Sequence, residues 1–209
     1  MQQTSWMLDH LAHETRVHHA AADGDRLAAM ERPTEQSYRA FLSRVYCFEA
    51  PLEAAFAATT GFNAGLVQTH TRTKRLAADL EAIGVAAGGL DMGPTLGFGD
   101  VADALGWMYV LQRNTLLHGL IFRQLQSRIG SVVEKANSYL TAHENTAGAR
   151  LRELGIALDT TARRTYIAAR IVHAAGEAFR CQRQWYACEA FQPRRSRPAT
   201  QGQLRGRAA

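Results

Sequence analysis

The chain has 209 residues, the usual size of one domain, and 46% of them are hydrophobic, which is enough to build a sizeable core. The net charge of +5 does not indicate nucleic-acid binding, because five arginines follow Pro193 with no acidic residue among them. Without these five charges, residues 1–193 have no net charge. We therefore predict one domain over residues 1–192 and a disordered, arginine-rich tail over residues 193–209.

The first helix is predicted over about residues 5–22 and is expected to end at the turn formed by Asp23, Gly24 and Asp25. Apolar residues recur there at spacings of three and four, which is the period of a helix with one buried face. Thr15 and His19 lie on that face. His19 is therefore expected to point inward.

The next helix is expected to begin after Thr34, a typical N-cap residue, and Pro51 within it should kink or interrupt it. A third helix is predicted over residues 66–83 and should stop at Gly84. The glycine-rich segment 85–99 is predicted to be a loop.

A central helix is predicted to begin at Asp100, its N-cap, and to run to Gly130. Asn114 and His118 lie on its apolar face at helical spacing. Two polar side chains in a buried face have two explanations. Either the core satisfies them with hydrogen bonds, or they face a ligand.

The remaining sequence also has the helical period. Residues 131–146 and 149–158 are predicted to be helical, and Asp159 is predicted to cap a last long helix that reaches Phe191. We find no β-alternating run of useful length. The pattern predicts an all-α protein.

Membrane insertion and secretion are not expected. No apolar run approaches the ~18 residues that a membrane span needs, and Asp9, His10 and His13 interrupt the apolar stretch that a signal peptide would require. The three cysteines lack the paired spacing of a metal site. We predict a cytoplasmic protein with no membrane or nucleic-acid partner.

Motifs with defined chemistry are scarce. The chain has no phosphate-binding loop, no dinucleotide-binding loop and no hydrolase nucleophile motif. The histidines near the amino terminus are spread around their helix rather than paired on one face as zinc ligands would be. An inward histidine, such as His19 or His118, is more often a hydrogen-bonded core residue than a ligand.

Five segments, in order over about residues 8–186, resemble one known family. They include a helix in which a threonine precedes a histidine by four residues, and a Tyr-Val-Leu run before a polar segment. The segments are residues 11–23, 38–53, 72–84, 104–111 and 175–185. Together they resemble the heme oxygenase family, especially its bacterial branch associated with phytochromes.

This resemblance implies an all-α, single-domain heme oxygenase-like helical bundle. It implies oxidative cleavage of heme, which is both substrate and prosthetic group, to biliverdin, Fe²⁺ and carbon monoxide. The reaction uses dioxygen and electrons from a reductase. The biliverdin would then serve a phytochrome-type photoreceptor.

The resemblance places the proximal ligand of the heme iron at His19, four residues after Thr15. The family often has Glu four residues after this ligand, where the chain has Asp23. The adjacent His18 is the competing ligand. It would require the helix to rotate by about a quarter-turn.

The distal side departs from the family pattern, Tyr-Val-Leu-Glu-Gly-Ser-Thr-Leu-Gly-Gly. The chain reads Tyr-Val-Leu-Gln-Arg-Asn-Thr-Leu-Leu-His over residues 109–118. Arg113, Leu117 and His118 replace glycines that allow the helix backbone to contact the heme. Together with Asn114, they are our candidates for the distal wall.

Three outcomes follow from these replacements. The helix lifts and heme is still cleaved, or His118 binds the iron opposite His19, or Leu117 and Arg113 fill the pocket and no heme binds. Arg113 is also a candidate partner for a heme propionate. A more distant alternative is a thiaminase-type hydrolase with Cys47 as nucleophile, although the sequence shows no base beside that residue.

Overall fold

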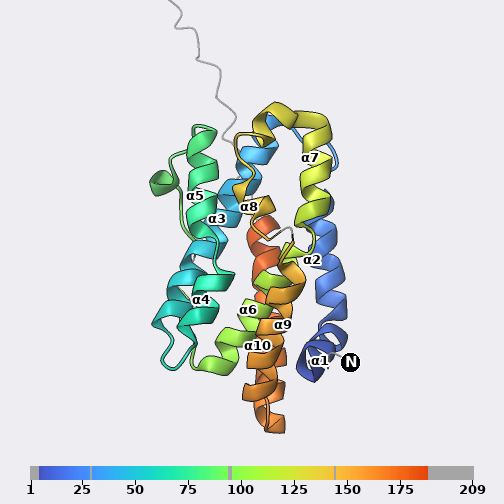
Figure 1. The fold of residues 1–209 in the computed structure, drawn as a ribbon, viewed down its shortest axis with the longest axis vertical. Coiled ribbons are helices and arrows are strands. Elements are labelled where there is room, and N and C mark those ends of the chain that lie inside the picture. Colours follow the sequence, from blue (N-terminus) through green and yellow to red (C-terminus); the bar gives the residue numbers. More distant parts are fainter. Residues whose placement is uncertain (1–4, 29, 94–95, 144, 188–209) are drawn as a thin grey trace, which may run out of the picture.

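The computed structural model describes residues 5–28, 30–93, 96–143 and 145–187, and these parts of the chain contain helices and no strand. The helices α6 (Val101–Thr115) and α10 (Thr165–Ala187) pack against each other in the most extensive contact of the fold. They lie near the middle of the molecule (Figure 1). The other elements are α1 (Trp6–Glu14), α2 (Arg16–Ala28), α3 (Glu35–Ala58), α4 (Ala64–His70), α5 (Thr73–Ala82), η1 (Ala87–Gly89), α7 (His118–Val133), α8 (Ser138–Thr141) and α9 (Ala147–Thr161).

The first predicted helix is two helices, and its predicted end is wrong. The backbone breaks at Thr15, whose hydroxyl donates to the carbonyl oxygen of Leu11 at 2.7 Å. The following helix, α2, continues through Gly24 to Ala28. Its buried side chains include Arg26, two residues beyond Gly24. Burial of this face outweighs the roughly 1 kcal/mol by which an interior glycine weakens a helix.

The predicted start of α3 is confirmed, because Thr34 and Ser37 form a reciprocal capping box. Pro51 lies inside α3 without interrupting it. The third predicted helix is divided into α4 and α5, and the break contains Arg72, whose side chain is almost completely buried. Gly84 follows α5 in the left-handed region at φ 77°, as expected for a helix stop.

The predicted central helix is also two helices. Asp100 caps α6 as expected by accepting hydrogen bonds from the backbone of Ala102 and Asp103. The helix ends at Thr115, and α7 begins at His118. This break lies in the segment where the chain departs from the heme oxygenase pattern.

The segments after α7 differ from the prediction as well. Only residues 138–141 of the predicted helix over residues 131–146 form an element of their own. Asp159 lies inside α9 and does not cap the last helix. Its carboxylate instead accepts from Ser5 Oγ and the Met7 backbone at the start of α1. The described part of α10 ends at Ala187, so Phe191 and the predicted tail over residues 193–209 lie outside the described residues.

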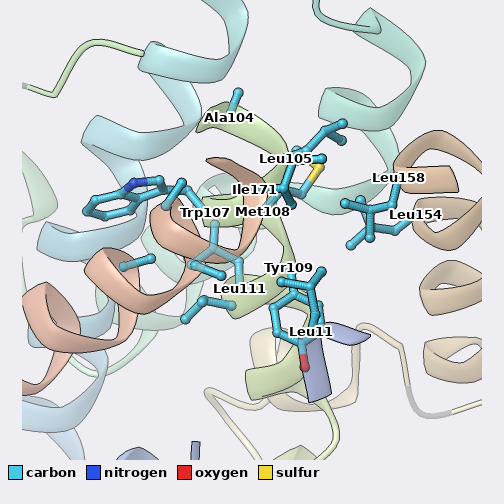
Figure 2. Close-up of a cluster of buried hydrophobic side chains, with 14 of the residues drawn as sticks. Leu11, Ala104, Leu105, Trp107, Met108, Tyr109, Leu111, Leu154, Leu158 and Ile171 are labelled. Atoms are coloured by element: carbon cyan, nitrogen blue, oxygen red, sulfur yellow. The ribbon is translucent and has the colours of Figure 1, made fainter. Parts of the chain in front are cut away.

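The core has two hydrophobic clusters. The first surrounds α6 where it packs on α10 and α9, and it includes Leu11 of α1; Figure 2 labels Leu11 and Tyr109 among its side chains. A Cβ atom at Gly106 would lie 2.5 Å from the carbonyl oxygen of Ile171, so glycine allows α6 and α10 to approach closely. The second cluster joins α3, α5, α7 and α8 around Tyr38 and Tyr139. No described helix is long and apolar enough to cross a membrane.

Candidate functional site

His19 lies on α2 at the edge of the first cluster, and both of its ring nitrogens face charged side chains. The Arg113 guanidinium, which comes from the last turn of α6, lies with Nη2 3.3 Å from Nδ1. On the other side, Oδ2 of Asp23 lies 2.9 Å from Nε2, although the pair is not aligned as a regular hydrogen bond. The ring of Phe179 on α10 is 6.1 Å away between centroids. The fold thus brings together three of the predicted site residues.

The environment of His19 favours its neutral form. Burial lowers the pKa of the imidazole, the Arg113 charge lowers it further, and Asp23 partly opposes both. The side chain is 19% exposed, so it lies near the surface while most of the ring is covered. A neutral imidazole at physiological pH has a lone pair available for a metal ion.

Two buried side chains, Tyr109 and Thr15, lie close to the His19 site. The Tyr109 hydroxyl lies beside Thr15 and Arg113, and burial raises the pKa of that hydroxyl. Thr15 is at the break between α1 and α2, one turn before His19. The break and the tyrosine therefore determine where α2 places its histidine relative to α6.

The other predicted residues of the distal segment face different surroundings. Asn114 forms a reciprocal amide pair with Gln182 on α10, with donor–acceptor distances of 3.0 and 3.3 Å. The core therefore satisfies Asn114, which is the first of the two explanations for a polar side chain on that face. Leu117 is partly buried and packs against the second hydrophobic cluster.

His118 lies in the second cluster at the start of α7 and is 3% exposed. Its ring is 4.6 Å from that of Tyr139 between centroids. Neither ring nitrogen has a hydrogen-bond partner of regular geometry, although the Tyr139 backbone lies near the ring. Burial places the pKa of His118 well below its usual value, and the charges of Arg72 and Arg26 lower it further. His118 is therefore a neutral, unpartnered imidazole.

Several other buried polar side chains surround His118. Glu49 Oε2 lies 3.5 Å from Nη2 of Arg72, and Glu49 Oε1 accepts from the Tyr139 hydroxyl at 2.8 Å. Arg72 also donates to the Leu111 carbonyl at 3.3 Å. We call this group the cationic cluster, because its arginines outnumber its carboxylate; it consists of Arg26, Glu49, Arg72, His118, Tyr139 and His143.

Of this cluster, the sequence pattern predicted only His118 as a site residue. A signal for one more member was present, since Arg26 follows His19 by seven residues and so shares its helix face. Because the first helix was expected to end at Gly24, Arg26 was not assigned to that face. Arg72 and His143 had no such signal, because they lie at helix breaks that the sequence pattern did not show.

Cys47 does not have the environment of a nucleophile. The thiol is buried, and burial together with the Asp91 charge raises its pKa to about 11. It is therefore protonated at neutral pH, and the thiaminase-type alternative has no support from this site.

Among solved structures, the chain is similar to the NO- and CO-bound heme oxygenase from Neisseria meningitidis. The TM-score is 0.71 at 18% sequence identity, and the match covers 94% of this chain and 97% of that one. The chain has the heme oxygenase fold. This confirms the predicted all-α, heme oxygenase-like class. No protein-family model matches the sequence, and no curated protein matches it.

Proposed function

We propose that this protein binds heme with His19 as the proximal iron ligand and cleaves it oxidatively to biliverdin. The observation that carries the proposal is the neutral imidazole of His19 between Asp23 and Arg113 in a chain with the heme oxygenase fold. Bound heme would supply the iron at which dioxygen reacts, with biliverdin, Fe²⁺ and carbon monoxide as products. A cytoplasmic location, a reductase as electron donor and a phytochrome-type acceptor of biliverdin belong to the same proposal.

The hydrogen-bonding chemistry of His19 fits an axial ligand. Guanidinium nitrogens only donate, so the contact with Arg113 requires the lone pair on Nδ1 and places the ring proton on Nε2, facing Asp23. A carboxylate beside the protonated nitrogen is the usual partner of a metal-bound histidine, because it orients the ring and increases its basicity. In this arrangement Nδ1 is the nitrogen available to iron.

Arg113 must move for iron to reach Nδ1. Its side chain is long and only partly buried, so a rotamer change displaces the guanidinium without moving α6. The displaced charge then becomes available to a heme propionate. The residues on the His19 side therefore fit a heme, on the condition that Arg113 moves.

A second candidate function is heme binding without cleavage. It is favoured by Arg113, which contacts His19 from the distal segment. The family pattern has a glycine at this position, which would leave His19 without such a contact. His118 would have to leave Tyr139 and the cationic cluster to act as a sixth iron ligand. Asn114 would have to leave Gln182 before it contacted a ligand.

Hemin titration followed by absorption spectroscopy tests the binding step. We expect His19→Ala to weaken hemin binding by about 100-fold, because the axial bond is lost. Asp23→Asn should weaken it by about 10-fold, the usual effect of losing the partner of a ligand. His18→Ala is the matched control and should bind as the wild type does. Equal binding by wild type and His19→Ala would refute the proposal.

A turnover measurement separates the two candidate functions. Hemin-loaded protein is mixed with a reductant, oxygen and catalase, and the loss of the heme band is recorded together with the formation of biliverdin. An enzyme loses the band and forms the product, and Arg113→Gly should then accelerate the reaction by removing the displaced guanidinium. A stable low-spin spectrum that is lost in His118→Ala would instead identify a non-catalytic protein with two histidine ligands.

A further inference from the structure

A cavity of about 320 Å³ lies between the end of α2, the first half of α3 and the end of α10. Its charged lining residues are Asp25, Arg26, Arg44 and Arg183, and its aromatic ones are Phe41 and Tyr186. Arg26 follows His19 by seven residues, or about 10 Å along the helix axis at 1.5 Å per residue. The cavity is therefore separate from the His19 site.

Positive charge exceeds negative charge in this lining. Arg183 is paired with Asp25, with Nε and Oδ2 2.7 Å apart. Arg44 donates to the backbone carbonyl of Tyr186, but its Nε is buried without a partner. Two arginines therefore contribute charge that no lining carboxylate neutralises.

Arg26 is the most unusual of these residues. It is 2% exposed, and none of its three guanidinium nitrogens has a hydrogen-bond partner of regular geometry. The nearby Glu49 already pairs with Arg72 and accepts from Tyr139. Burial acts to lower the pKa of Arg26, but Tyr186, Tyr139 and Glu49 outweigh it, so the group keeps its charge. A buried cation that lacks regular hydrogen-bond partners destabilises the fold unless a bound anion pairs with it.

We propose that this cavity binds a small aromatic carboxylic acid, with its carboxylate on Arg26. A guanidinium matches a carboxylate with two parallel hydrogen bonds. The guanidinium carbon of Arg26 lies 5.6 Å from the centroid of the Phe41 ring, and Tyr186 lines the same cavity, so a flat apolar group fits beside the charge. The volume is near the lower limit for ligand pockets, as suits a single-ring acid. This site does not depend on the proposed heme chemistry.

Thermal unfolding of the hemin-free protein with benzoate tests the site, with benzamide as the uncharged analogue of the same shape. At a benzoate concentration on the order of 10 mM and constant ionic strength, the wild-type Tm should rise by at least about 2 °C, whereas benzamide should leave it unchanged. Arg26→Met should unfold about 2–4 °C higher than the wild type without ligand, because an unpartnered buried charge is removed, and should not respond to benzoate.

Two further variants make the result specific. Arg170→Met removes an exposed arginine that pairs with Asp100 and Asp103, and it should keep the full benzoate response. His19→Ala should also keep it, so failure of the heme proposal and failure of this one are distinguishable. A benzoate response that persists in Arg26→Met would overturn the proposal. So would a lower Tm of that variant, no response of the wild type, or a response to inorganic phosphate but not to benzoate.

Discussion

His19 and His118 are both histidines on inward helix faces, yet the fold treats them differently. His19 lies at the edge of the first cluster, where an arginine faces one ring nitrogen and an aspartate the other. His118 lies inside the second cluster and has no hydrogen-bond partner of regular geometry on either nitrogen. The same position in a helical pattern therefore leads to two kinds of site. One is a supported imidazole near the surface, and the other is part of a buried group with excess positive charge.

Because of this difference, substitutions at the two histidine sites should affect different properties, ligand binding at one and folding stability at the other. Substitutions around His19 change groups that are partly exposed, so they should affect binding more than folding. Substitutions around His118 change groups that are buried and charged, so they should affect folding most.

The largest effect on stability is expected for Glu49→Gln. This change removes the carboxylate that pairs with Arg72 and accepts from Tyr139, and so it leaves a buried cation unpaired. We expect the free energy of unfolding to fall by about 3–5 kcal/mol in urea titrations. Glu177→Gln, at an exposed pair with His173, is the matched control and should change stability by less than about 0.5 kcal/mol. Equal effects of the two substitutions would show that the cationic cluster does not contribute to folding.

The next largest effect is expected from acid. Burial, followed by the charges of Arg72 and Arg150, lowers the pKa of His143 to about 4. The unfolded chain takes up this proton near pH 6.5, so His143 lowers stability progressively as the pH falls from about 6.5 towards 4. The loss should approach 3 kcal/mol in urea titrations at several pH values. His143→Leu should lose less stability over this range than the exposed-site control His13→Leu, and equal slopes would contradict the assignment.

A smaller effect is expected where the core satisfies its polar groups. Asn114→Leu leaves the buried amide of Gln182 without its partner and should cost about 1–3 kcal/mol. The double variant Asn114→Leu with Gln182→Leu should cost less than the sum of the single changes, because neither partner is then stranded. Additive costs in a double-mutant cycle would mean that the amide pair does not form in solution.

The smallest effect, and the only stabilising one among these four, is expected for His118→Leu. Replacing a buried imidazole that lacks a regular hydrogen-bond partner by an apolar side chain of similar size should raise the free energy of unfolding by about 1 kcal/mol. His19→Leu should change stability by less than about 0.5 kcal/mol while weakening hemin binding as strongly as His19→Ala does. A loss of more than about 1 kcal/mol in His118→Leu would show that the imidazole has a stabilising partner, as His19 has.

The sequence was sufficient for the helical class and for several helix ends. Thr34 and Asp100 cap their helices as predicted, because a cap depends on a side chain and the backbone two or three residues away. The approach of His19 to Asp23 was also predictable, since residues four apart share a helix face. The breaks at Thr15, at Arg72 and before His118 were not predicted. At Arg72 and His118 they accompany side chains buried among other helices, which a local pattern does not record.

By itself, then, the sequence determined the helical class, the two caps Thr34 and Asp100, and the shared helix face of His19 and Asp23. Only the tertiary structure decided the partners of each inward polar group. Arg113 reaches His19 across 94 positions of sequence, and Arg26, Glu49, Arg72 and His118 meet because four separate segments converge. A helical period specifies the direction of a side chain relative to its own axis. What that side chain meets depends on the packing of the other helices, because burial and charge act through space rather than along the chain.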